Sequence, residues 1–243
     1  MALTQASIEG QQGSSEFLFM ALAEELKLPL QQILRQSELG QLLERSQQNL
    51  QTIQTTTRAT LQLLDGYLLS LRLASDPDEK FAVEPVCVSE ILHDTSQQLG
   101  KLAEQYDVVL NVHVKSRYEP VMAHRNALKM AFVSLGYTLI EALPATGASQ
   151  LSLQLAVHRT KYGIVAGMYC DSEMLTPQAF QQAQRLYGQV RQPLVGVSPN
   201  AGAGIFVADA ILHAMSSKLR VGRYQKLPGF AVTLPSSNQL TLV

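Results

Sequence analysis

The chain has 243 residues, of which 46% are hydrophobic and 16% are charged, a size that suits one large or two modest domains. Its 19 lysines and arginines nearly balance its 20 acidic residues, and the net charge of -1 gives no broad positive surface for nucleic acid. Because there is no run of about 18 apolar residues and no signal-peptide pattern at the start, we expect a cytoplasmic protein without a membrane segment.

The first part of the chain predicts a tail followed by a long helix. Residues 1–13 are polar and contain glycine, so we interpret them as a flexible tail before a domain that spans residues 14–75. Apolar residues then recur at helical spacing as far as about Leu39, with a kink expected at Pro29 and an end at Gly40.

A second helix with an apolar seam follows the first. The seam keeps the period of a helical bundle and comprises Leu50, Ile53, Thr57, Leu61, Leu64, Leu68 and Leu71. Two such helices form an antiparallel hairpin that leaves one apolar face uncovered, so the sequence favours a homodimeric four-helix bundle. The alternative is a hairpin that packs on the rest of its own chain.

A second domain of mixed composition is expected after a short polar linker. Pro77 stops the helix, and we place the linker at residues 76–80 and the second domain at residues 81–243. Its expected helices are residues 89–104, 127–143, 177–186 and 204–215, and its expected strands are residues 108–114, 150–158, 163–170, 218–224 and 230–234. Cys87 and Cys170 are too far apart for a metal motif, so we expect reduced thiols in or near cores. The mixed order predicts an α+β fold.

Residues 18–30, Leu-Phe-Met-Ala-Leu-Ala-Glu-Glu-Leu-Lys-Leu-Pro-Leu, resemble the phosphoacceptor box of sensor histidine kinases, F-L-A-N-V-S-H-E-L-R-T-P-L. Glu24 stands where that family carries its phosphorylated histidine, and a carboxylate is a weak nucleophile toward an anionic phosphate. Glu25 keeps the acidic residue that follows. Leu28 replaces the Thr or Asn that often positions water for dephosphorylation in the family.

The rest of the chain resembles the catalytic half of the same family. That half is a Bergerat-type (GHKL ATPase) α/β sandwich, a fold shared with gyrase and MutL. Residues 202–215, Gly-Ala-Gly-Ile-Phe-Val-Ala-Asp-Ala-Ile-Leu-His-Ala-Met, align without a gap with the family motif G-L-G-L-A-I-V-K-R-I-V-E-A-H. In active members the glycines that correspond to Gly202 and Gly204 let backbone amides approach the nucleotide phosphates.

Two further nucleotide-binding boxes depart from the family pattern. Thr138 stands where the resemblance implies a magnesium-binding asparagine, and Glu141 stands where it implies a basic residue, so a carboxylate would repel the phosphates. The adenine-binding aspartate aligns with Cys170, although a shift of one residue would place Asp171 there. Met174 would obstruct the glycine turn of this box.

The resemblance implies a catalytically degenerate histidine kinase, or pseudokinase, that serves as a dimeric scaffold or adaptor in two-component signalling. The implied partner is a response-regulator receiver domain or another kinase, and the implied docking surface comprises Glu24, Glu25, Lys27 and Leu28. No cofactor is then expected.

Two alternatives stay open. One is a divergent ATP-binding histidine kinase or ATPase that uses Mg-ATP, Asp171 and the glycines at 202 and 204. The other is a phosphotransfer protein that relays phosphoryl groups to a response regulator. The loss of the histidine weighs against relay, although a carboxylate can form an acyl phosphate.

Overall fold

The computed structural model describes residues 30–38, 46–75, 81–114, 118–146, 151–171 and 201–237. Residues 30–38 are helical. The helices that follow are α2 (Ser46–Ser75), α3 (Val88–Gln105), α4 (Arg125–Ala142), the short 3-10 helix η1 (Leu143–Thr146) and α6 (Ala201–Ala214). The strands are β1 (Glu84–Val86), β2 (Val109–Val114), β3 (Val121–Ala123), β4 (Ser152–Thr160), β5 (Gly163–Cys170), β6 (Leu219–Tyr224) and β7 (Leu227–Leu234). The expected tail, the start of the first helix, the linker at 76–80 and the helix at 177–186 lie outside the described residues.

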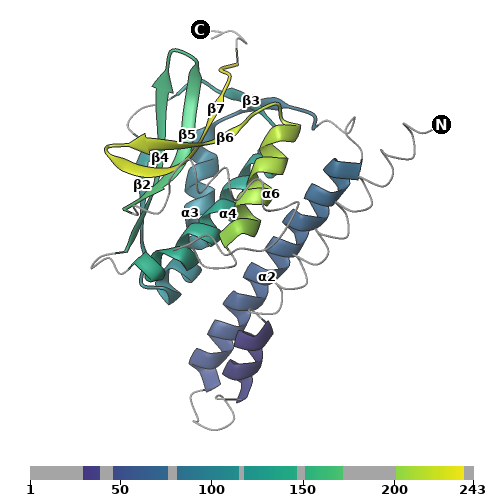
Figure 1. The fold of residues 1–243 in the computed structure, drawn as a ribbon, viewed down its shortest axis with the longest axis vertical. Helices are drawn as coiled ribbons and strands as arrows, with labels where there is room; N and C mark the ends of the chain where they lie inside the picture. Colours follow the sequence, from purple (N-terminus) through teal and green to yellow (C-terminus); the bar gives the residue numbers. More distant parts are fainter. Residues whose placement is uncertain are drawn as a thin grey trace, which may run out of the picture.

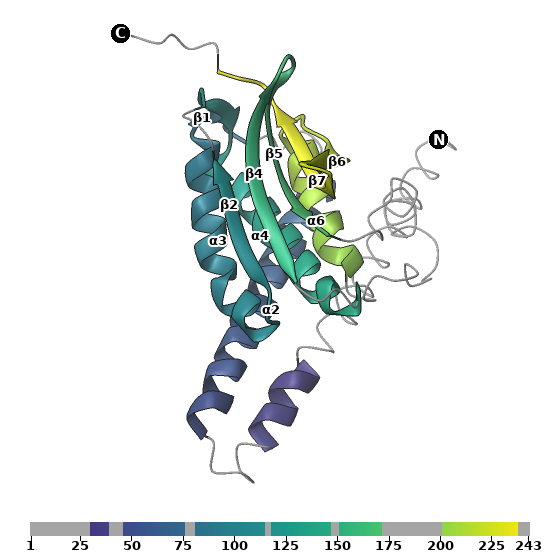
Figure 2. The same ribbon diagram turned by 90° about the vertical axis from the view of Figure 1, so that its left-hand side faces the viewer.

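The domain after α2 is a two-layer α/β sandwich, which confirms the predicted α+β class. Five strands form one sheet in the order β2-β4-β5-β7-β6, in which only β2 and β4 run parallel. Figure 2 looks onto this sheet, with α3, α4 and α6 behind it, and Figure 1 shows α2 on the far side of those helices. The helix layer therefore lies between the sheet and α2.

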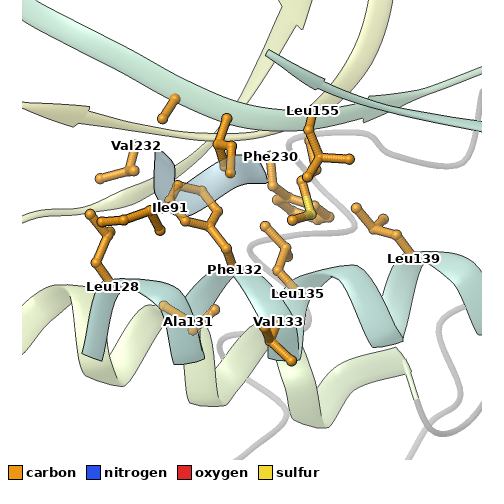
Figure 3. Packing of buried hydrophobic residues seen from close by; sticks show 14 of the residues in the cluster. Ile91, Leu128, Ala131, Phe132, Val133, Leu135, Leu139, Leu155, Phe230 and Val232 are labelled. Atoms are coloured by element: carbon orange, nitrogen blue, oxygen red, sulfur yellow. The ribbon is translucent and has the colours of Figure 1, made fainter. Parts of the chain in front are cut away.

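The hydrophobic core fills the space between the sheet and the helix layer. Helix α4 is buried on all sides from Ala131 to Ile140, because the sheet covers one side and α3, α6 and α2 contact the others. Figure 3 shows Phe132 and Leu135 of α4 pointing toward Phe230 of β7. Burying each such side chain contributes roughly 1.5–3 kcal/mol, so this layer dominates the stability of the domain.

Helix α2 has one covered face and one open face. Thr56, Ala59, Thr60 and Gly66 are buried, and α2 contacts α3, α4 and α6 on this side. Threonines fit into this helix because their hydroxyls donate hydrogen bonds to the backbone carbonyl four residues earlier. The Thr60 hydroxyl donates to the Thr56 carbonyl oxygen at 2.8 Å. Figure 1 shows the N-terminal part of α2 extending past the sandwich.

The open face of α2 carries a stripe of exposed leucines. Leu50, Leu61 and Leu68 are 55%, 55% and 50% exposed, and they lie about three and two turns apart on one side of the helix. Leu64, which the sequence places in the same seam, packs instead against the core of its own chain. Part of the predicted seam is therefore exposed and part packs on the chain's own core, and the homodimer stays a prediction.

Several boundaries differ from the predictions. The strand expected at 150–158 is β4, which runs to Thr160 because the turn comes later, at Lys161 and Tyr162, before Gly163 with φ of 133°. The short strands β1 and β3 were not predicted, because three residues are too few to show an alternating pattern. They pair with each other, and Val121 of β3 also forms an isolated bridge with Ser236. Cys170 is buried, as expected, and Cys87 is partly buried. Among the helices of the described ranges, none is both long enough and apolar enough to cross a bilayer.

Candidate functional site

The candidate site is the part of α4 where the sequence analysis placed the magnesium-binding position. Helix α4 begins after His124, whose Nδ1 accepts a hydrogen bond from the Ala127 backbone N–H at 3.1 Å and so caps the helix. Ser134 and Thr138 lie one turn apart in its middle, and both are buried. Their hydroxyls are thus held inside the molecule.

Gly204 in the first turn of α6 lies directly against this part of α4. A Cβ atom added at Gly204 would overlap the Thr138 hydroxyl and the Ser134 carbonyl oxygen. The glycine is therefore required for close contact between two helices. The structure brings Thr138 and Gly204 together, as the resemblance implies, but the space between them does not hold even a methyl group. Gly202 lies in the same helical turn.

Helix α2 packs against Ser134 and against α6 at Gly66. A Cβ atom added at Gly66 would lie 2.8 Å from Cγ1 of Val207 on α6 and 3.4 Å from the Ser134 hydroxyl oxygen. Val207 is fully buried. Three helices thus meet at this point through small side chains, and α2 covers the joint between α4 and α6.

The end of β5 carries the two candidates for the adenine contact. Cys170 belongs to the core between the sheet and the helices, whereas Asp171, the next residue, is exposed. Burial, and secondarily the Asp171 carboxylate, raises the pKa of the Cys170 thiol to about 12. A neutral thiol accepts hydrogen bonds weakly, so the residue on the helix-facing side is poorly suited to bind an adenine amino group.

Glu141 lies in the last turn of α4, and its electrostatic neighbours are tyrosines. Desolvation raises its pKa to about 7. Two tyrosines lie in the same region. Burial, and secondarily the Glu141 carboxyl group, raises the pKa of Tyr137 to about 12, and the same two causes raise the pKa of Tyr106. The Tyr137 hydroxyl donates a hydrogen bond to Oε1 of Gln62 on α2 at 2.8 Å.

The predicted docking residues Glu24, Glu25, Lys27 and Leu28 lie outside the described residues. Sequence reasoning missed Ser134, Gly66 and Val207, which complete the three-helix joint. Gly66 did carry a signal, because glycine inside a helix is unfavourable by about 1 kcal/mol relative to alanine and so indicates a close approach. The residue types of Ser134 and Val207 and their sequence neighbours do not indicate which helix these two residues contact.

Comparisons with known proteins are informative only at the level of structure. No protein-family model and no curated protein matches the chain. Among solved structures, the histidine kinase AdeS of Acinetobacter baumannii is 13% identical, covers 88% of this chain and 98% of its own, and superposes with a TM-score of 0.54. Full-length ShkA, solved in complex with AMPPNP, is 14% identical and covers 94% of this chain and 46% of its own, also with a TM-score of 0.54.

These identities are too low to show more than the arrangement of the chain. The α/β domain therefore has the fold of the histidine-kinase ATPase domain.

Proposed function

We propose that this chain is a catalytically degenerate histidine kinase, a pseudokinase, that acts as a dimeric scaffold or adaptor in two-component signalling. The observation that carries the proposal is the contact between α4 and α6 at Thr138 and Gly204. The resemblance to the kinase family implies that metal and phosphates bind at these positions. Here the Thr138 hydroxyl is buried and a methyl group at Gly204 would already overlap it.

The residues present do not fit Mg-ATP. A threonine hydroxyl reaches less far than an asparagine amide oxygen, and this hydroxyl is buried against α6. The thiol of Cys170, with its pKa raised to about 12, is a poor substitute for an adenine-binding carboxylate. Glu141 supplies no positive charge for the phosphates. These three residues correspond to the metal, adenine and phosphate contacts, so their unfavourable effects on the affinity for Mg-ATP add together.

A non-catalytic role requires surfaces for partners, and two are proposed. The first is a homodimer contact within residues 14–75. The exposed stripe of Leu50, Leu61 and Leu68 supports it, because half-exposed leucines on one helix face are stabilised by contact with the apolar face of a second chain. The second is the surface at Glu24, Glu25, Lys27 and Leu28, where the histidine-kinase resemblance implies docking of a receiver domain.

Nucleotide binding tests the proposal. We expect isothermal calorimetry with millimolar Mg-ATP to show no saturable heat, because two lost contacts of about 2 kcal/mol each weaken affinity roughly a thousandfold. Full-length ShkA, whose structure contains AMPPNP, is the positive control in the same buffer. Saturable binding in the micromolar range would contradict the pseudokinase proposal and favour an ATP-binding enzyme.

A further inference from the structure

The two outer strands of the five-stranded sheet differ in charge. Figure 2 shows β2 and β6 at opposite sides of the sheet, so each has one neighbouring strand and one open edge among the described residues. Strand β2 contains no lysine, arginine or acidic residue. Strand β6 and the residues beside it carry exposed cations, which are Lys218, Arg220, Arg223 and Lys226. The β6 edge is therefore positively charged, whereas β2 is uncharged.

No acidic side chain in the described part of the chain pairs with these cations. Ion pairs join Arg125 to Glu90 and Arg159 to Glu119, but none involves the cations of the β6 edge. The sequence has no aspartate or glutamate from position 210 to position 243, although the whole chain has 20 acidic residues. Asp209, on the helix α6 that contacts β6, makes no ion pair with them either. The positive charge of this edge is thus available to a partner.

The open edge of β6 also presents backbone hydrogen-bonding groups. A two-residue turn, Gln225 and Lys226 with φ of 49° and 72°, joins β6 to β7. Tyr224 and Leu227 flank this turn, so they exchange hydrogen bonds with each other, and every second residue of β6 from Tyr224 backwards bonds to β7. The residues between them direct their N–H and C=O groups to the open edge: Leu219, Val221 and Arg223.

Packing contacts fix both ends of β6. The ring of Tyr224 lies 5.4 Å from that of His158 and 5.5 Å from that of Tyr169, measured between centroids. At the other end of the strand, Leu219 is buried in the main core. An edge held in this way loses little conformational freedom when another strand adds to it.

We propose that the β6 edge binds an extended, acidic segment of a protein partner, which adds to the sheet as a sixth strand. Arg220 and Arg223 are an odd number of residues apart, so their side chains leave β6 on opposite faces of the sheet and carboxylates on either face of the segment can meet a cation. A peptide offers both donors and acceptors to the open backbone groups. Phosphates of nucleic acid or lipid offer acceptors only, which favours a peptide partner.

The same charges disfavour a second copy of this chain at this edge. Two β6 edges side by side would bring arginines together, and β2 of another copy has no carboxylate to offer them. Cations on an edge strand therefore prevent self-pairing and select an acidic partner for one and the same reason. The proposal does not depend on whether the chain binds nucleotide.

The first test uses a synthetic peptide in which glutamate alternates with valine. By fluorescence anisotropy at low ionic strength we expect saturable binding, at least about tenfold tighter than that of the same peptide with lysine in place of glutamate. N-methylation of two adjacent central residues blocks both edges of the peptide and should abolish binding while leaving its charge unchanged. No saturable binding at millimolar peptide, or full affinity of the methylated peptide, would overturn the proposal.

The second test locates the added strand by amide hydrogen exchange. With saturating peptide, the amides of Leu219, Val221 and Arg223 should exchange at least about tenfold more slowly, because they gain hydrogen bonds. Those of Arg220 and Gly222 already bond to β7 and should change little. A single-stranded oligonucleotide or an anionic phospholipid vesicle that binds more tightly than the peptide, with the three open amides unprotected, would overturn the proposal.

Variants of the protein test the role of charge. Arg220→Glu together with Arg223→Glu should weaken peptide binding by about tenfold or more. Arg58→Glu together with Lys101→Glu makes the same change in net charge at exposed positions on α2 and α3, and it should leave the affinity within about twofold. Circular dichroism checks that each variant folds, and the lysine and N-methylated peptides decide the matter if one does not. Wild-type affinity in the folded Arg220→Glu, Arg223→Glu variant would overturn the proposal.

Discussion

Gly66 in α2 and Gly100 in α3 are both helical, but their surroundings differ. A Cβ atom at Gly66 lies 2.8 Å from the branched side chain of Val207, whereas one at Gly100 meets nothing within 4 Å. We predict that Gly100→Ala raises the free energy of unfolding by about 0.5–1 kcal/mol through helix propensity. Gly66→Ala should lower the free energy of unfolding by about 1–2 kcal/mol, because the overlap of the new Cβ atom with Val207 outweighs the gain in helix propensity. Urea unfolding followed by circular dichroism measures both.

A second substitution identifies the cause. Val207→Ala removes the methyl group that a new Cβ at Gly66 would strike, so the double variant Gly66→Ala with Val207→Ala should lose less stability than the sum of the two single variants. Additive losses, or equal gains from both glycine substitutions, would show that α2 does not pack on α6 as described.

The side chains at the candidate site illustrate what sequence can and cannot predict. The residue types of Thr138, Glu141 and Cys170 already differ from those that the histidine-kinase resemblance implies for a nucleotide site. Their environments could not be derived, because burial depends on which helices meet. That Glu141 repels phosphates stays a prediction, and the structure adds that Tyr106 and Tyr137 are its ionisable neighbours.

At the scale of the elements, helix α2 has an exposed apolar face and an apolar face packed on its own domain, and substitutions can test each face separately. Leu61 is exposed, whereas Leu64 contacts the core of its own chain. We predict that Leu61→Glu gives folded monomers, because it places a charge in the proposed dimer contact only. Leu64→Glu should also lower the thermal midpoint, because it places a charge against the core. Analytical ultracentrifugation together with thermal unfolding distinguishes these outcomes.

The wild-type protein provides the reference for this comparison. It should sediment as a dimer at micromolar concentration, since several leucines at about 1.5–3 kcal/mol each would otherwise stay in contact with water. A wild-type monomer at that concentration, or a Leu61→Glu variant that remains dimeric, would refute a dimer through this face of α2.

The elements were predictable where their patterns are long. The apolar period of α2 and the alternation of Val108–Val114, which contains β2, identify a helix and a strand by themselves. The three-residue strands β1 and β3 were missed because they contain too few residues to alternate, and they form through pairing with each other and a bridge from Val121 to Ser236. The division of the α2 seam, with Leu64 inside and Leu61 outside, depends on the tertiary packing of α2 on its own domain.

At the scale of the whole molecule, the residues that resemble the phosphoacceptor box (18–30) and the ATPase-like domain depart from the family pattern in separate parts of the chain. We therefore predict that Glu24→His does not create autophosphorylation, because restoring the acceptor leaves the contact between Thr138 and Gly204 in place. The measurement is transfer of label from γ-labelled ATP. Label on the Glu24→His protein would show that the domain still uses ATP.

The opposite change at position 24 tests docking. Glu24→Lys should weaken binding to a receiver-domain partner and leave the thermal midpoint unchanged, because the docking proposal places this side chain on the surface and surface substitutions usually alter stability by less than about 0.5 kcal/mol. Glu24→Gln serves as the matched control that removes charge without reversing it. Unchanged affinity in Glu24→Lys would exclude this surface as the docking site.

The contact between Gly204 and Thr138 also bears on evolutionary history. If the chain descends from an active kinase, as the proposed function implies, the magnesium-binding residue could have been regained by one substitution only while the space beside it stayed open. In this chain α6 has settled against α4, so a longer asparagine side chain at position 138 would have to displace a helix packed on the core. On the proposed function, restoring a magnesium ligand at position 138 would therefore also require a substitution that makes room in the contact between α4 and α6.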